Sequence, residues 1–235
     1  MSKAKLYMIP SLLGEGDPGA ILGDELIQTV VGIRYFIVEN EKNARRFLVG
    51  CGMRDILNDV EFGILNEHTP PEDYGFILEP LFEGKDTGII SDAGCPGIAD
   101  PGAELVAIAH GNSIDVIPLI GPSSIVLSLM ASGLNGQKFS FRGYLPAKSA
   151  ERVKELKELE RRSGRNNETQ IFIEAPYRNM QLLEDMIRVL SPETRVCVAC
   201  NLTQADQYVK TKQVKNWNNN LPEVNKKPTI FLLLS

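Results

Sequence analysis

Short apolar runs recur along the whole chain, and segments with helical periodicity lie between them. Runs of this length are typical of strands, which we predict at residues 5–9, 35–38, 87–90, 114–117, 138–141, 170–173, 195–198 and 229–232. Strands that alternate with helices are typical of α/β proteins with mainly parallel sheets. We therefore predict an α/β fold with mainly parallel sheets.

Helix start signals and apolar faces predict the intervening helices. Asp100 is a suitable N-cap for one helix, and Pro122 is placed to begin a second. Ser149 is expected to cap a third, charged helix that continues through Arg162. A fourth helix is predicted from an apolar face formed by Leu183, Met186, Ile187 and Leu190.

Composition limits the class of protein. The chain has 235 residues, of which 43% are hydrophobic and 23% are charged, so it can bury one large core or two modest ones. Its first residues contain no apolar signal segment, and the apolar run at residues 230–234 is too short to span a bilayer. We expect a soluble, cytoplasmic protein that is not bound to a membrane.

Charge is distributed unevenly along the chain, whose net charge is −5. Residues 1–112 carry 8 Lys and Arg against 18 Asp and Glu, whereas residues 113–235 carry 17 against 12. We place a domain boundary near Pro118, which gives an N-terminal α/β domain at residues 1–117 and a C-terminal α/β domain at residues 118–235. The basic second half fits a polyanionic partner, and two ordinary solvated surfaces explain the pattern equally well.

Two of the four cysteines, Cys197 and Cys200, have the C-x-x-C spacing of some metal and redox sites. The segment around them is a predicted strand, in which residues three apart point to opposite faces. No further Cys or His cluster completes a zinc site. We therefore interpret both cysteines as part of a strand and expect no metal site.

Three turns rich in glycine and proline each follow a predicted strand, at residues 9–18, 91–102 and 118–124. Ligands of open α/β sheets bind beyond the carboxyl ends of the strands, and glycine lets the backbone approach them. A single glycine such as Gly14 is explained as well by an ordinary tight connection. The crowding of Asp, Gly and Pro in residues 91–102 favours a ligand site. Neither G-x-G-x-x-G nor G-x-x-x-x-G-K-[ST] is present.

The turn at residues 91–102 reads S-D-A-G-C-P-G-I-A-D-P-G. It resembles the S-D-A-G-x-P-x-x-x-D-P-G motif of the bacterial small-subunit rRNA cytidine 2′-O-methyltransferases, a group within the tetrapyrrole methylase (class III) superfamily. Further stretches resemble motifs of this group in the same order, at residues 6–10, 118–124, 131–134, 143–148 and 172–178. Six matches in register cover nearly the whole chain and identify it as a divergent member.

The resemblance implies two α/β lobes that hold S-adenosylmethionine in the cleft between them, and commonly a homodimer. Carried over by position, it implies cofactor contacts at Pro10, Asp92, Ala93, Gly94, Pro96, Ile98, Ser123, Ser124, Leu145, Glu174 and Pro176. Most of these residues lie on the turns that the glycine and proline pattern had already indicated.

The chain departs from the family pattern on the acceptor side. The A-E-D-T-R, H-x-H-N-E and R-E-L-T-K motifs appear here as V-E-N-E-K at residues 38–42, L-N-E-H-T at 65–69 and C-N-L-T-Q at 200–204. The cofactor motifs are retained, so these departures predict cofactor binding with a changed acceptor preference.

The catalytic base is left open by the sequence. Methyl transfer from a sulfonium needs neither a metal nor a covalent intermediate, and a base adds about a hundred- to ten-thousand-fold for a hydroxyl acceptor. Candidate bases are Asp92, Glu174, Glu39 and His68. His68 is explained as well by a solvated loop, and Glu174 by a structural ion pair with Arg178.

The predicted acceptor is RNA, through a ribose 2′-hydroxyl of an rRNA-type substrate. A basic run is placed to follow its phosphate backbone, at Lys148, Arg152, Lys154, Lys157, Arg161, Arg162 and Arg165. A solvated helix with internal pairs such as Glu158 with Arg162 explains this run equally well. Two alternatives remain: methylation of a small molecule such as a tetrapyrrole, or a cofactor-binding protein without turnover.

Overall fold

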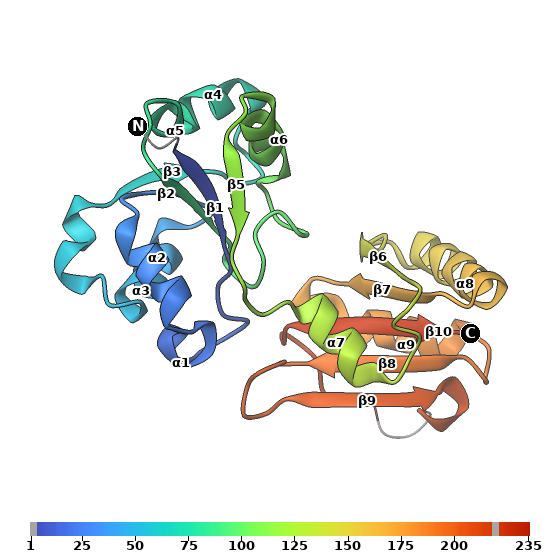
Figure 1. The fold of residues 1–235 in the computed structure, drawn as a ribbon. Helices are drawn as coiled ribbons and strands as arrows, with labels where there is room; N and C mark the ends of the chain where they lie inside the picture. The colour runs from blue at the N-terminus through green and yellow to red at the C-terminus, as the bar shows by residue number, and fades with distance from the viewer. Residues whose placement is uncertain (1–3, 218–220) are drawn as a thin grey trace. The chain divides into compact units, whose positions relative to one another are not determined.

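The chain divides into two compact units, Met1–Ser123 and Ser124–Ser235. A computed structural model describes residues 4–217 and 221–235. Each unit contains one five-stranded sheet with helices packed against it, which confirms the predicted α/β fold in two parts (Figure 1). The boundary that the sequence places near Pro118 falls at the end of the last strand of the first unit, a few residues before this division.

The sheet of the first unit is wholly parallel, in the strand order β3–β2–β4–β1–β5. Its strands are β1 (Lys5–Ile9), β2 (Tyr35–Val38), β3 (Glu61–Ile64), β4 (Thr87–Ile90) and β5 (Asp115–Pro118). Three of the four strands predicted here have the expected bounds, and the fourth begins and ends one residue later. β3 was not predicted, because Glu61-Phe-Gly-Ile64 lacks a continuous apolar run.

Helices cover both faces of this sheet. They are α1 (Pro18–Leu22), α2 (Asp24–Gly32), α3 (Glu41–Gly50), η1 (Arg54–Asp59), η2 (Pro71–Asp73), α4 (Tyr74–Ile77), α5 (Glu79–Phe82) and α6 (Ala103–Gly111). Side chains along β2 point alternately to the two faces of the sheet, which gives two apolar cores. Phe36 and Val38 pack with α2 and α3, whereas Ile37 packs with α4, α5 and α6. A sheet buried on both faces reads as continuous apolar runs, as this sequence does.

The sheet of the second unit is mixed, in the order β6–β7–β10–β8–β9. Its strands are β6 (Phe139–Tyr144), β7 (Thr169–Ile173), β8 (Arg195–Cys200), β9 (Tyr208–Gln213) and β10 (Thr229–Leu234). β6 and β7 pair in parallel, while β7–β10, β10–β8 and β8–β9 pair antiparallel. The strand and helix alternation thus indicated the α/β class, and the parallel arrangement it favours is found mainly in the first unit. β9 was not predicted.

The second unit buries one large apolar core between its sheet and two helices. Its helices are α7 (Ser124–Ser132), α8 (Ser149–Asn166), η3 (Pro176–Arg178), α9 (Asn179–Val189) and η4 (Val214–Asn216). Leu156 and Leu159 of α8, Leu183 of α9 and the fully buried Trp217 belong to this core. Figure 1 shows α7 in front of the sheet, with α9 behind it.

Three helix starts differ from the predictions. α6 begins at Ala103 after Gly102, because the Asp100 carboxylate hydrogen-bonds with Ser91 and does not cap the helix. α7 begins at Ser124, two residues after Pro122. Lys148 is the N-cap of α8, and the Ser149 hydroxyl instead donates to Asp185, with 3.1 Å between the oxygens.

The C-x-x-C pair lies within β8, as the strand interpretation predicts. Cys197 and Cys200 are both buried free thiols. Within residues 4–217 and 221–235, no three His, Cys, Asp or Glu side chains form a group that could hold a metal ion. Every helix in the same described ranges is too short or too polar to cross a bilayer.

Candidate functional site

The turn after β4, residues 91–102, is held in shape by its own polar groups. The Ser91 hydroxyl hydrogen-bonds with the Asp100 carboxylate and accepts the Ala93 N–H at 3.2 Å. Gly94 has φ +80°, a left-handed conformation that side chains with a Cβ rarely adopt. The motif therefore encodes a specific backbone path, in which serine and aspartate close the loop and glycine permits its bend.

The turns after β1 and β5 pack directly against this one. Ser11 donates its N–H to the Gly94 carbonyl at 2.9 Å. A Cβ on Gly121 would lie only 2.2 Å from Cγ of Pro10, so the turn after β5 approaches Pro10 closely because position 121 lacks a side chain. The three glycine and proline turns of the sequence thus meet at the carboxyl ends of neighbouring parallel strands.

A cavity of about 480 Å³ opens beside these turns. It is lined by the loop after β1, by α3 and by the start of the β4 turn, including Ser11, Asn43, Asp92 and Ala93. Its volume lies within the range of about 300–1,000 Å³ that is typical of small-molecule sites. The buried Ser11 hydroxyl has no hydrogen-bond partner within the described residues, so it is available to a ligand.

Carboxylates gather at the carboxyl ends of β2 and β4. Asp92 is exposed and accepts a hydrogen bond from Asn43 Nδ2 at 2.8 Å, whereas Asp100 hydrogen-bonds with Glu39. Burial, followed by the negative charges of Asp100 and Asp92, raises the pKa of Glu39 from 4.5 to about 7. Burial also raises the pKa of Asp100, against hydrogen bonds from Ser91 and Glu39 that lower it. Within this cluster, Glu39 is therefore the carboxyl group whose pKa lies near neutral pH.

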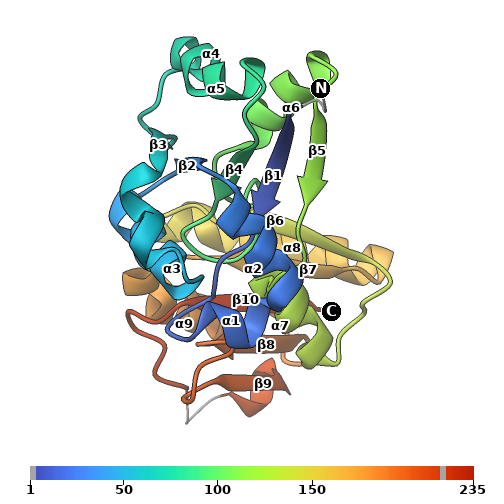
Figure 2. The ribbon, with the colours of Figure 1, turned by 60° about the vertical axis from the view of Figure 1, so that its left-hand side comes forward.

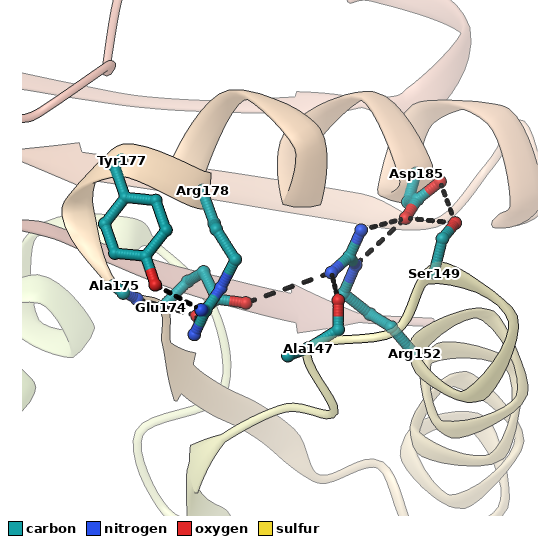
Figure 3. Close-up of polar contacts among 8 residues, drawn as sticks. All are labelled: Ala147, Ser149, Arg152, Glu174, Ala175, Tyr177, Arg178 and Asp185. Atoms are coloured by element: carbon teal, nitrogen blue, oxygen red, sulfur yellow. Dashed lines mark hydrogen bonds and ion pairs between the residues drawn. The ribbon is translucent and has the colours of Figure 1, made fainter.

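Glu174, directly after β7 in the second unit, forms its hydrogen bonds through one carboxylate oxygen, whereas its buried Oε2 has no hydrogen-bond partner within the described residues (Figure 3). Its side chain is 0% exposed, and Oε1 accepts hydrogen bonds from the Ala175 N–H at 2.7 Å and from Arg178 Nη2 at 2.6 Å. Arg178 also donates to the Tyr177 hydroxyl at 2.6 Å. The predicted ion pair of Glu174 with Arg178 is therefore present, and it does not exclude Glu174 as a base, because Oε2 is not engaged in it.

Arg152 of α8 connects Glu174 to a second carboxylate. Its Nη1 lies 4.0 Å from Glu174 Oε2 and donates to the Ala147 carbonyl at 2.9 Å, while Nε and Nη2 both donate to Asp185 Oδ2 at 2.9 and 2.7 Å. The Arg152 side chain is 3% exposed. One arginine therefore ties the loop after β7, the loop before α8 and helix α9 together.

The burial of Arg152 corrects the predicted basic run. Arg152 faces the core in line with Leu156 and Leu159, so it is not available to a phosphate backbone. The predicted internal pair of Glu158 with Arg162 is also different, because Glu158 pairs with Arg161 at 2.8 Å, and Arg162 lies 3.5 Å from Glu168. The exposed cations of α8 are Lys154, Lys157, Arg161 and Arg165.

The structure places the predicted cofactor residues on both units. Seven lie in the first unit, at Pro10, Asp92, Ala93, Gly94, Pro96, Ile98 and Ser123. Four lie in the second unit, at Ser124, Leu145, Glu174 and Pro176. The first unit brings Pro10 and residues 92–94 together, with Asp92 and Ala93 exposed and Gly94 and Pro96 buried. In the second unit, Leu145 and Glu174 are buried, and Pro176 is exposed.

Sequence reasoning missed three polar residues of these sites. Asn43 binds Asp92 from α3, and its only sequence signal is its position one helical turn after the start of that helix. Asp185 pairs with Arg152 across α8 and α9, and it was hidden within an apolar helical face. Ser11 follows the predicted strand and proline directly, so its place in the turn could have been found.

Known proteins resemble this chain along most of its length. A family model described as tetrapyrrole (corrin/porphyrin) methylases matches residues 65–216. The Vibrio cholerae protein "Ribosomal RNA small subunit methyltransferase I" is 31% identical over 208 residues, covering 87% of this chain and 67% of the relative. The Haemophilus influenzae protein of the same name is 35% identical over 211 residues, covering 90% and 70%.

Solved structures share the fold at low sequence identity. The methyltransferase CobJ aligns with a TM-score of 0.66 at 14% identity, covering 99% of this chain and 94% of that one. Uroporphyrin-III-C-methyltransferase from Thermus thermophilus aligns with a TM-score of 0.58 at 16% identity, covering 99% and 93%. At these identities the likeness concerns the fold alone.

Proposed function

We propose that this chain, a methyltransferase that belongs to the family of tetrapyrrole (corrin/porphyrin) methylases, transfers a methyl group from S-adenosylmethionine to a ribose 2′-hydroxyl of ribosomal RNA. The turn at residues 91–102 is the main support for this proposal. Two residues of its S-D-A-G-x-P motif fix the path of the backbone: Ser91 hydrogen-bonds with Asp100, and Gly94 adopts a positive φ. The relatives at about 30% identity are named as ribosomal RNA methyltransferases.

The residues of the first unit fit the cofactor. S-adenosylmethionine supplies a methyl group on a positively charged sulfonium, together with hydroxyl and amino groups that form hydrogen bonds. The exposed Asp92 carboxylate and the unpartnered Ser11 hydroxyl match these groups, and both line the cavity of about 480 Å³. Gly94 and Gly121 let the turns beside this cavity pack closely, because a Cβ at either position would meet Leu13 or Pro10. We infer that these turns bind and orient the donor.

The second unit contributes positioning. Holding the donor and the acceptor hydroxyl in line lowers the barrier by up to roughly 7–11 kcal/mol, so rigid loops are the main requirement. Arg152 and Arg178 fix the buried Glu174, which precedes Ala175 and Pro176 in the predicted cofactor segment. His68 is a solvated side chain, 84% exposed on its loop, so Glu39, Asp92 and Glu174 are the remaining candidate bases.

RNA is favoured over the small-molecule alternative by the sequence relatives and by the charge of the second unit. Lys154 and Lys157 lie exposed on α8, where they can contact a phosphate backbone. The solved structures, one of which is named for uroporphyrin-III, share only the fold. A homodimer, which the resemblance implies, and a cytoplasmic location, which the sequence composition predicts, stay predictions.

Labelled cofactor distinguishes the candidate functions. The protein is incubated with S-adenosylmethionine labelled on its methyl group, once with ribosomal RNA and once with a porphyrin precursor. Label in RNA supports the proposal, and label in the precursor alone supports the small-molecule alternative. Cofactor binding without transfer to either acceptor would leave a binding protein without turnover.

A further inference from the structure

The outer strand of the first sheet has an unpaired edge. β3 lies at the end of the strand order and pairs with β2 alone. Glu61 and Leu65 donate their N–H groups to carbonyls beside β2, at Arg34 and Val38, with donor–acceptor distances of 2.9 Å. Because a strand alternates, the N–H and C=O of Phe62 point the other way, toward the free edge.

A groove of about 840 Å³ runs along this edge. β3 forms one wall, and η2, α4 and α5 form the other. Figure 2 shows β3 at the end of the sheet farthest from β5. Ile64, Phe76 and Ile77 line it with apolar surface, and the Phe76 side chain is 77% exposed. An exposed strand edge beside apolar side chains is a site where another strand can add.

The rim of the groove is acidic. Glu61, Asp73, Glu79 and Glu83 all line it and are exposed. The one lysine in the lining, Lys85, lies 3.3 Å from Glu83 and so pairs within the rim. The groove therefore offers a partner backbone hydrogen bonds, an apolar floor and a surplus of negative charge.

We propose that this groove binds an extended, lysine- or arginine-rich peptide segment of another protein, which adds to β3 as a further strand. Side chains of a strand alternate, so basic residues at every second position would face the acids at η2 and α5, which are Asp73, Glu79 and Glu83. The edge N–H and C=O groups hold the peptide backbone, and the complementary charge selects the basic partner.

Charge decides against the other occupants of this groove. An RNA backbone is repelled by the acidic rim, and residues 1–112 as a whole carry 18 acidic against 8 basic residues. Two copies of this chain that met through the groove would bring their acidic rims together, which costs free energy. A basic peptide segment is attracted by the acidic rim, so it meets neither the repulsion of an RNA backbone nor that between two acidic rims.

Binding of a defined peptide to the full chain tests the proposal. The probe is a fluorescein-labelled octapeptide of alternating lysine and valine, and binding is followed by fluorescence anisotropy at low ionic strength. The double variant Glu79→Lys, Glu83→Lys is expected to bind about tenfold or more weakly, since two attractions become repulsions. The matched control Glu104→Lys, Asp115→Lys changes the net charge equally at exposed acids outside the groove and should bind like the unmodified protein.

Strand addition is tested separately from charge. A probe in which proline replaces each valine keeps all the lysines but cannot pair along a strand edge, and it should lose binding. The bound alternating peptide should also slow hydrogen exchange at the Phe62 amide. Equal binding of both peptides, or equal loss in both charge variants, would overturn the proposal. A dimer in sedimentation that only the Glu79→Lys, Glu83→Lys variant dissociates would show that a second copy occupies the groove.

Discussion

Arg152 is expected to be the most sensitive charged residue of the second unit, and Arg152→Met tests this. Methionine keeps much of the length of the side chain and its place in the apolar stripe of α8, but it removes every donor. Asp185 then retains hydrogen bonds from Ser149 and Arg188, while Glu174 keeps Arg178 at Oε1 but loses the guanidinium that lies 4.0 Å from Oε2 (Figure 3). The change leaves two carboxylates buried with less compensation.

The magnitude follows from burial. The side chains of Arg152, Glu174 and Asp185 are 3%, 0% and 9% exposed. Removing one partner of a pair buried to this degree costs about 3–5 kcal/mol, because the remaining charge stays out of water. That loss is a large share of the roughly 5–15 kcal/mol that stabilises a typical domain. We therefore expect Arg152→Met to unfold the second unit at clearly lower denaturant concentration.

The assay uses the single tryptophan of the chain, Trp217, which is fully buried in the core of the second unit. Its fluorescence during urea unfolding reports that unit, even where the two units unfold separately. Arg188→Met is the matched control, because Arg188 also pairs with Asp185 but is 63% exposed, and its loss should cost about 0–1 kcal/mol. Equal stability of the two variants would refute the buried-network interpretation.

The pH dependence of the Arg152→Met effect has a defined sign. Burial raises the pKa of Asp185, but hydrogen bonds from Arg188, Arg152 and Ser149 outweigh burial and hold the pKa below its usual range. A lowered carboxyl pKa contributes stability that is present above its ordinary value of 3.8 and is lost as the pH falls through the folded value. The loss of unfolding free energy in Arg152→Met should therefore be largest at pH 7 and become smaller in acid.

Three further predictions concern the turns, the carboxylate cluster and α8. Gly94→Val should weaken S-adenosylmethionine binding in calorimetry by about tenfold or more, because a Cβ strains a backbone with φ +80° and would lie 3.2 Å from Leu13. The control Gly111→Ala places its Cβ in open space and should leave the affinity unchanged. The raised pKa of Glu39 contributes stability that is full below pH 4.5 and is lost as the pH rises through about 7. Glu39→Gln should therefore flatten the fall in the urea midpoint between pH 5 and 8, and an unchanged fall would show that Glu39 is not its cause. Replacing Lys154 and Lys157 with alanine should lower the salt slope of RNA affinity by about 1–2, and an unaltered slope would assign both to a solvated face.

Central strands were all predicted, and the two strands that the sequence missed are edge strands, although the edge strands β5 and β6 were also predicted. Residues 87–90 and 229–232 form continuous apolar runs because β4 and β10 are central and buried on both faces. β3 and β9 were missed, and both lie at the edge of a sheet. Edge strands are partly exposed, so Tyr208-Val-Lys-Thr-Lys-Gln213 mixes polar and apolar residues and carries a weak strand pattern.

The site was predictable where it depends on the backbone and less so where it depends on side-chain pairing. The glycines of residues 91–102 indicated a turn near a ligand, and the turn has the positive φ angles that need them. Asp100 was taken as a helix cap, since only the fold brings Ser91 within reach of it. Arg152 was counted with the exposed cations, although its spacing to Leu156 and Leu159 already placed it on the buried stripe of α8.

The chemical position of the transferred methyl group tests the central proposal most directly. Small ribosomal subunits that lack ribose methylation are incubated with the protein and with methyl-labelled S-adenosylmethionine, and the RNA is digested to nucleosides for mass spectrometry. The account predicts label in a 2′-O-methyl nucleoside, and loss of that label in the Gly94→Val protein. Label confined to methylated bases, or no label in RNA from a protein that binds the cofactor, would contradict it.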